Sequence, residues 1–155
     1  MFPLFTQAIR QVAFGLLAVM LPLQALAATD SIVLGMGCFW GAEKRMGEIP
    51  GVLDVESGYA GGDAEHTDYK GVLGLEKALW LGKSEQRNHA EVVKVTFDPH
   101  KVSLERVLIG FWENHNPTQR DRQGNDIGSN YRSAIYFTSD AQREVALRTR
   151  DTYQQ

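Results

Sequence analysis

The side chain best suited to covalent chemistry is the only cysteine, Cys38, in the segment Gly-Met-Gly-Cys-Phe-Trp-Gly. A short apolar strand predicted at residues 32–34 ends at Gly35 and Gly37, and helical spacing follows. A thiol at the start of a helix faces free backbone N–H groups and the positive end of the helix dipole, which favour the thiolate. The glycines allow a tight turn and a close approach of a ligand. The segment therefore predicts a reactive cysteine.

Two large aromatic side chains, Phe39 and Trp40, follow the cysteine directly and indicate an apolar socket beside it. A buried, inert thiol is the first alternative. A dinucleotide-binding loop is the second, but the spacing G-x-G-x-x-x-G is one residue too long for that fingerprint.

Composition limits the classes of function. The chain has 155 residues with Lys+Arg 16 and Asp+Glu 19, which is the length of one domain and gives a formal charge of −3. This charge gives no electrostatic reason to expect a nucleic-acid partner. A single cysteine excludes an internal disulfide and every CxxC-type redox or zinc motif.

The first 27 residues have the pattern of a secretory signal peptide. Arg10 precedes an apolar run at residues 12–23, and an Ala-Leu-Ala cleavage pattern ends at residue 27. We therefore expect export to the periplasm or the medium, with a domain at residues 28–155. An uncleaved signal that anchors the protein to the membrane is the alternative. Export would place Cys38 in an oxidising compartment, where unpaired thiols are unusual.

Strand and helix patterns alternate along the rest of the chain. Strands are predicted at residues 32–34, 52–59, 91–97 and 131–137, and helices after Cys38, at residues 72–81, after Ser103 and after Ser139. The segment between residues 116 and 130 is predicted to be a loop. Gln142 completes a capping box with Ser139, and the helix that follows has no stop signal. This order predicts an α+β fold: a small mixed sheet with helices packed on it, as a two-layer sandwich with a ferredoxin-like core.

Several spaced segments carry a family resemblance. They are Gly-Cys-Phe-Trp-Gly-Ala-Glu at 37–43, Ser-Gly-Tyr-Ala-Gly-Gly at 57–62, His-Ala-Glu-Val-Val at 89–93, Phe-Trp-Glu-Asn-His at 111–115, and Arg-Gln-Gly-Asn-Asp-Ile-Gly at 122–128 leading to Tyr-Arg-Ser-Ala at 131–134. Together they resemble the type A peptide methionine sulfoxide reductases. The motifs stand in the family's order and extend over nearly all of residues 32–155.

The resemblance implies catalytic or binding roles for seven side chains. The nucleophile would be Cys38, the acid Glu91, the two phenol donors to the sulfoxide oxygen Tyr69 and Tyr131, the supporting carboxylate Asp126, and the grip on the methyl group Phe39 and Trp40. This set fits the chemistry, because a sulfoxide oxygen leaves only once it is protonated. A reductase needs a soft nucleophile, an acid and an apolar pocket. To act near pH 7, Glu91 needs a raised pKa, which a partly dry aromatic pocket would produce.

The implied activity is thiol-dependent reduction of methionine S-sulfoxide, free or in proteins, through a sulfenic acid on Cys38. Such an enzyme repairs oxidised proteins. A thioredoxin-like protein or another dithiol would reduce the sulfenic acid. We expect no bound cofactor, no metal and no nucleic acid, and a monomeric protein.

The sequence departs from the family pattern in two places. The usual Asn-Pro-Thr-Tyr is His-Thr-Asp-Tyr at residues 66–69, and the stretch from Tyr69 to Glu91 is longer than in the commonest family form. Family members also continue beyond this length, many of them to C-terminal resolving cysteines. Tyr153 does not match the further active-site tyrosine. We therefore expect that the C-terminal part of the catalytic domain is missing.

Three other functions remain open from the residues. The first is a truncated fragment that binds methionine sulfoxide without turnover. The second is a cysteine hydrolase with His89 or His115 as the base, although an orienting partner is not obvious. The third is a zinc deaminase, indicated only by His-Ala-Glu at residues 89–91 and lacking the Pro-Cys-x-x-Cys ligands.

Overall fold

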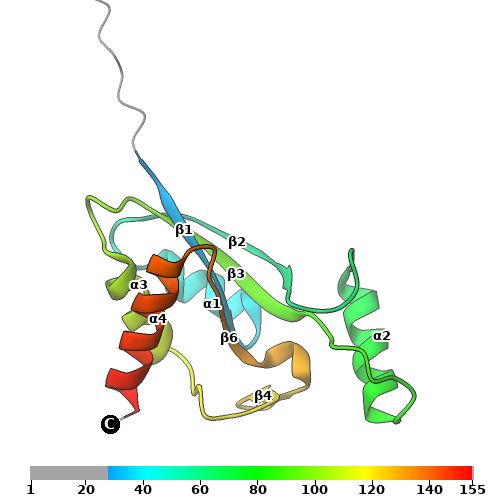
Figure 1. Ribbon diagram of the computed structural model, residues 1–155. Helices are drawn as coiled ribbons and strands as arrows, with labels where there is room; N and C mark the ends of the chain where they lie inside the picture. The colour runs from blue at the N-terminus through cyan, green and yellow to red at the C-terminus, as the bar shows by residue number, and fades with distance from the viewer. Residues whose placement is uncertain (1–27, 155) are drawn as a thin grey trace, which may run out of the picture.

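The computed structural model describes residues 28–154. The signal peptide predicted at residues 1–27 lies outside the described residues. The main strands are β1 (Asp30–Met36), β2 (Val52–Ala60), β3 (Ala90–Phe97) and β6 (Ser133–Tyr136), and the helices are α1 (Phe39–Gly47), α2 (Tyr69–Trp80), α3 (Leu104–Glu113) and α4 (Asp140–Tyr153). A two-stranded hairpin, β4 (Arg122–Gln123) and β5 (Asp126–Ile127), and a 3-10 helix, η1 (Ser129–Tyr131), precede β6 (Figure 1).

The main sheet has the order β2-β3-β1-β6, and every neighbouring pair in it is antiparallel. This is the order of a ferredoxin-like core, so the predicted α+β fold is confirmed. The prediction of a mixed sheet is wrong in one respect. The parallel strands β1 and β2 are not neighbours, because β3 lies between them and is antiparallel to both.

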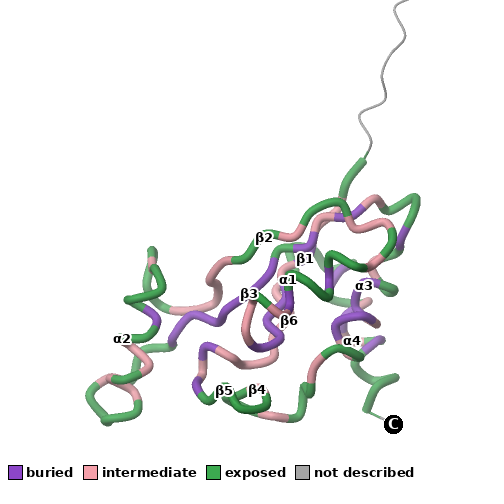
Figure 2. The backbone as a smooth tube through the Cα atoms, turned by 180° about the vertical axis from the view of Figure 1, so that it is seen from behind, coloured by how far each residue is buried: buried purple, intermediate pink, exposed green. Residues whose placement is uncertain are grey.

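The hydrophobic core fills the space between one face of the sheet and helices α1, α3 and α4. Alternate residues of β1 and β3 point into it, as the strand period requires. The core cluster consists of Ile32, Leu34, Met36, Ala42, Met46, Val93, Val95, Phe97, Val102, Val107, Leu108, Phe111 and Ala146. On the exposed side of the β2–β3 pair, Lys94 donates to Glu56 across the strands at 2.9 Å. The two-layer arrangement is therefore confirmed (Figure 2).

Side-chain caps fix the starts of three helices. Ser103 accepts a hydrogen bond from the Arg106 N–H, and Ser139 accepts one from the Gln142 N–H, as the sequence predicts. The second half of the predicted capping box differs, because the Gln142 side chain accepts from the Thr138 N–H at 3.0 Å. Asp68 caps α2 by accepting from the Gly71 N–H at 2.8 Å, so this helix starts three residues before the predicted position. None of the helices between residues 28 and 154 is long and apolar enough to span a membrane.

Two local predictions differ from the structure near the start of β6. The predicted loop at residues 116–130 contains the β4–β5 hairpin, which turns at Gly124 with φ +60°. Tyr131 ends the 3-10 helix η1, and β6 begins only at Ser133. The stretch was predicted to be irregular because its polar side chains and glycines lack the alternation of a longer strand.

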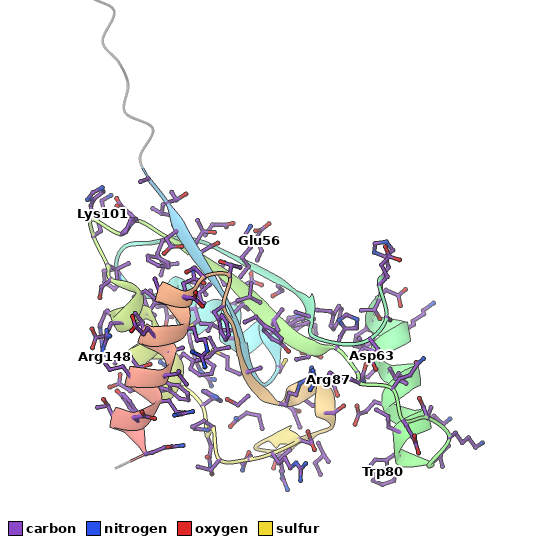
Figure 3. All side chains as sticks on the ribbon, in the orientation of Figure 1. Glu56, Asp63, Trp80, Arg87, Lys101 and Arg148 are labelled. Atoms are coloured by element: carbon purple, nitrogen blue, oxygen red, sulfur yellow. The ribbon has the colours of Figure 1, made fainter. Side chains whose placement is uncertain are left out.

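Helix α2 stands away from the sheet, beyond the ends of β2 and β3 (Figure 1). Its two connecting segments are joined where the Arg87 N–H donates to the Asp63 carboxylate at 2.7 Å and the Asp63 N–H donates to the Arg87 carbonyl at 3.0 Å. Figure 3 shows these two residues near each other and Trp80 at the far end of the helix. The Trp80 side chain is 83% exposed.

Candidate functional site

The cysteine that the sequence predicts to be reactive lies where β1 turns into α1. Gly37 adopts φ +93°, and a Cβ atom there would approach the Gln123 side chain to 2.7 Å. A glycine is therefore required at this turn both for conformation and for space. Cys38 itself is the N-cap residue of α1, half-buried and with a free thiol. The predicted position of the thiol at a helix start is observed.

A cavity of about 310 Å³ opens beside the thiol. It is lined by Met36, Cys38, Gly41, Arg45, Asn114, Gln123, Gly124 and Asp126. Asp126 is exposed and begins β5, directly after the turn of the β4–β5 hairpin. The structure thus brings the predicted supporting carboxylate and the predicted nucleophile to one cavity.

Glu91 lies near the start of β3 and is only 3% exposed. Its Oε2 accepts from the N–H of Phe39 at 3.1 Å, and its Oε1 accepts from Nδ2 of Asn130 at 3.5 Å. Burial raises the pKa of this carboxyl, the two hydrogen bonds partly oppose the rise, and the charge of Asp126 adds to it. The first N–H of α1 therefore connects a carboxyl of raised pKa directly to the residue after the cysteine.

Two tyrosines lie near this carboxyl. Tyr59 pairs with Glu91 across β2 and β3. Burial and then the charge of Glu91 raise the pKa of Tyr59, with smaller effects from Tyr69 and Tyr131. Burial and Glu91 also raise the pKa of Tyr131, with smaller contributions from Asp126 and Cys38. Tyr59 and Tyr131 therefore lie within electrostatic range of the same carboxyl, whereas the predicted donor Tyr69, at the start of α2, is 58% exposed.

The two aromatic residues after the cysteine occupy different environments. Phe39 is half-buried against the core, and its ring centroid lies 5.6 Å from that of Tyr59. Trp40 is 79% exposed. Neither side chain lines the cavity beside Cys38. The structure thus places Phe39 on the Glu91 side of the site and leaves Trp40 open to solvent.

Two residues at this site were missed by sequence reasoning. Tyr59 could have been identified from the sequence, because it lies in a predicted strand that pairs with the strand carrying Glu91. Asn130 is 1% exposed, and its Oδ1 is buried without a hydrogen-bond partner among the described residues. An asparagine in a loop carries no signal that it will be buried, so only the fold could identify it.

The histidines proposed as hydrolase bases are engaged elsewhere. His89 bonds through Nδ1 to the Gly62 N–H at 3.3 Å and through Nε2 to the Ala64 carbonyl at 2.8 Å. His115 bonds to the Phe111 carbonyl at 2.7 Å and to the Ser133 hydroxyl at 2.8 Å. Within residues 28–154, neither histidine hydrogen-bonds Cys38, and no group of three or more His, Cys, Asp or Glu side chains could hold a metal ion. The geometry therefore does not favour a hydrolase.

Comparison with known proteins agrees with these features. Residues 30–155 match the family described as peptide methionine sulfoxide reductase. The chain is 48% identical over 126 residues to the mitochondrial peptide methionine sulfoxide reductase of Mus musculus, covering 81% of this chain and 50% of that protein. It is 47% identical over 124 residues to the peptide methionine sulfoxide reductase MsrA of Xanthomonas oryzae pv. oryzae, covering 80% and 53%. The chain thus spans about half the length of these curated relatives.

Solved structures give the same result. Methionine sulfoxide reductase A of Corynebacterium diphtheriae superposes with a TM-score of 0.65 at 38% identity, covering 81% of this chain and 55% of that chain. The reduced form of Mxr1 from Saccharomyces cerevisiae superposes with a TM-score of 0.70 at 29% identity, covering 84% and 71%. With the match over residues 30–155, these similarities establish that the chain belongs to the peptide methionine sulfoxide reductase family.

Proposed function

We propose that this chain reduces methionine S-sulfoxide, free or in proteins, and so repairs oxidised proteins. One observation carries the proposal: a free thiol at the start of α1 is adjacent to an N–H group that bonds a buried carboxyl of raised pKa. A soft nucleophile and a proton donor are the two groups that removal of a sulfoxide oxygen requires.

The reaction proceeds by transfer of the sulfoxide oxygen to Cys38. The thiolate attacks the substrate sulfur and forms an S–S bond to it, while Glu91 donates a proton to the oxygen. The resulting hydroxyl group then passes from the substrate sulfur to Cys38: the substrate S–O bond and the S–S bond break, an S–O bond to Cys38 forms, and the methionine thioether leaves. Reduction of the substrate by two electrons is balanced by oxidation of the thiol to sulfenic acid. The proton that Glu91 gives up replaces the one lost by the thiol.

The surrounding side chains orient the sulfoxide. We assign Tyr131 as a hydrogen-bond donor to its oxygen, since its raised pKa keeps the phenol protonated and able to donate. We assign Tyr69 as the second donor from the family resemblance. From the family resemblance we assign the apolar contact with the methyl group to Phe39 and the exposed Trp40. Asp126 contributes to the cavity wall. Tyr59 is close enough to Glu91 to serve as a further donor.

We infer that an external dithiol regenerates the enzyme. One thiol displaces water from the sulfenic acid to form a mixed disulfide. The second thiol then releases Cys38 and leaves the reductant as a disulfide. Mxr1, one of the structural relatives above, has also been solved in complex with Trx2. We infer that a thioredoxin-like protein is the reductant here and that no bound cofactor or metal takes part.

We further propose that the protein works outside the cytoplasm. The support is the signal-peptide pattern at residues 1–27. Expression of the full chain followed by cell fractionation and N-terminal sequencing tests this proposal. A mature N-terminus at residue 28 in the periplasm or medium supports it, whereas an intact N-terminus in the cytoplasm contradicts it.

The activity is tested by a single-turnover experiment on residues 28–155, reduced and shown to be folded by circular dichroism. The protein is mixed with a peptide containing methionine S-sulfoxide, and mass spectrometry follows both the peptide and Cys38. We expect one equivalent of methionine, a sulfenic acid on Cys38, and repeated turnover once dithiothreitol is added. The R-sulfoxide peptide is the matched control. A folded protein that binds the peptide but leaves both it and the thiol unchanged would instead be a binding fragment.

A further inference from the structure

Glu76 is the one acidic residue of α2 and has no part in the chemistry described above. Its side chain is directed to the polypeptide before β6. Oε1 accepts from the Ser129 N–H at 2.9 Å, and Oε2 accepts from the Ser129 hydroxyl at 2.5 Å. The Glu76 carboxylate thus binds both hydrogen-bond donors of Ser129, which begins η1 and lies 53 residues away in the sequence.

Ser129 directly precedes two residues of the candidate site. Asn130 donates to Glu91, and Tyr131 is one of the assigned phenol donors. The packing here is tight, because a Cβ atom on Gly128 would approach Oδ1 of Asn130 to 2.5 Å and the carboxyl carbon of Glu76 to 3.3 Å. A shift of Ser129 would therefore be transmitted to the amide that contacts Glu91.

The same carboxylate also reaches the segment that leads into β3. Nδ2 of Asn88 donates to Oε2 of Glu76 and to the Val72 carbonyl, each at 3.0 Å. Oδ1 of Asn88 accepts from the His89 N–H at 2.9 Å. Glu91 follows two residues later. Glu76 therefore connects the two segments whose relative position determines the contact between Asn130 and Glu91.

Glu76 is charged at neutral pH. Burial alone would raise its pKa, but hydrogen bonds from Ser129 and Asn88, together with the charge of Arg132, lower the pKa below its ordinary value. Hydrogen bonds to an ionised acceptor are stronger than neutral ones. The carboxylate is thus suited to hold the two segments together.

We propose that Glu76 is a positioning residue, which holds η1 so that Asn130 and Tyr131 face Glu91. The inference deepens the proposed function and rests on it for its effect on rate. It also gives α2 a role: the helix stands outside the core and brings this one carboxylate to the site.

The test is the pKa of Glu91, measured by NMR titration of ¹³C-labelled glutamate carboxyls in the wild type and in Glu76→Ala. Loss of Glu76 frees Asn130, whose hydrogen bond lowers the pKa of Glu91. We therefore expect that pKa to rise further in the variant. Removal of a negative charge without movement would lower the pKa, so the sign separates positioning from electrostatics. Glu85→Ala, which removes an exposed carboxylate from the segment after α2, is the charge-matched control.

The rate supplies a second measurement. The single-turnover rate should fall about 10- to 100-fold in Glu76→Ala, with little change in the sulfoxide concentration that gives half-maximal rate. Glu76→Gln keeps an acceptor oxygen and should restore part of the rate. Ser129→Ala keeps its N–H donor and should shift the pKa of Glu91 in the same direction by less. This milder variant serves if Glu76→Ala does not fold.

The outcomes for the two proposals are distinct. A wild type that forms no methionine refutes the proposed function, while the pKa of Glu91 still tests the position of η1. A pKa of Glu91 that is unchanged or lowered in Glu76→Ala and Ser129→Ala overturns the positioning role, whatever the activity.

Discussion

Helices α1 and α2 both follow strands that lead to the Cys38 end of the sheet, but they are held in place differently. Helix α1 buries Ala42 and Met46 in the core. Helix α2 buries only Val72 and contributes no residue to the core cluster of the described chain. Polar contacts connect it instead, with Glu76 bound to Ser129 and Asn88.

The difference separates two tasks. Apolar packing holds β1, β3 and α1 together and so sets the position of Cys38 relative to Glu91. Directional hydrogen bonds set the position of the η1 segment, which carries Asn130 and Tyr131. Apolar contacts stabilise the whole domain, whereas a polar contact outside the core adjusts a local position. The two regions should therefore respond differently to substitution.

The largest effect is expected at the Cys38 end of the sheet. Cys38→Ser should abolish methionine formation, because a serine hydroxyl cannot accept the sulfoxide oxygen as a sulfenic acid. The single-turnover assay measures the loss, and circular dichroism checks that the variant is folded. Methionine formation at the wild-type rate would show that another group carries the reaction.

Core truncation is expected to affect the whole domain. Phe111 is 0% exposed and lies within the core cluster. Phe111→Ala should lower the free energy of unfolding by about 3–5 kcal/mol, from lost burial and the cavity left behind. Urea denaturation followed by circular dichroism measures the change. A loss under about 1 kcal/mol would contradict the assignment of the core.

Replacement of the proposed proton donor, Glu91, should have a smaller effect on the rate than loss of Cys38. Glu91→Gln keeps the size of the side chain but removes its acid, so the single-turnover rate at neutral pH should fall about 100-fold. Stopped-flow mixing with quench and mass spectrometry measures the rate. Glu48→Gln, which removes an exposed carboxylate from the end of α1, is the control and should retain the wild-type rate. Equal rates in the two variants would remove Glu91 from the mechanism.

Glu91 should also make stability depend on pH. Its pKa is raised in the folded protein, so the folded state holds the proton more tightly than the unfolded state. The resulting stabilisation is complete below the unfolded pKa of about 4.3 and is lost as the pH rises through the folded pKa. Urea titrations of the wild type and Glu91→Gln at several pH values measure this difference. We expect the free energy of unfolding of the wild type to fall relative to that of Glu91→Gln as the pH rises. A relative increase with pH would contradict the raised pKa of Glu91.

The smallest effect is expected at the far end of α2. Trp80 is 83% exposed, so Trp80→Ala should change the free energy of unfolding by no more than about 0.5 kcal/mol. The same urea titration applies. A loss comparable to that of Phe111→Ala would mean that α2 is packed as firmly as the core, and the contrast between the regions would fail.

The parts of the fold that could be predicted are those with a regular local pattern in the sequence. The alternation in β1 and β3 and the caps at Ser103 and Ser139 are local signals, and they predicted the core elements. The turn at Cys38 was predictable because glycines mark it. Asn130 and Glu76 join the site through contacts between segments 39 and 53 residues apart. Such contacts leave no local pattern in a single sequence.

The most direct test of the account is the pH dependence of the single-turnover rate in the wild type and in Glu91→Gln. If the buried carboxyl donates the proton, the wild-type rate should fall as the pH rises through the pKa of Glu91, and this fall should be absent in the variant. A wild-type rate that does not decline with pH, or a variant that declines in the same way, would contradict the assignment of Glu91 as the acid that releases the sulfoxide oxygen.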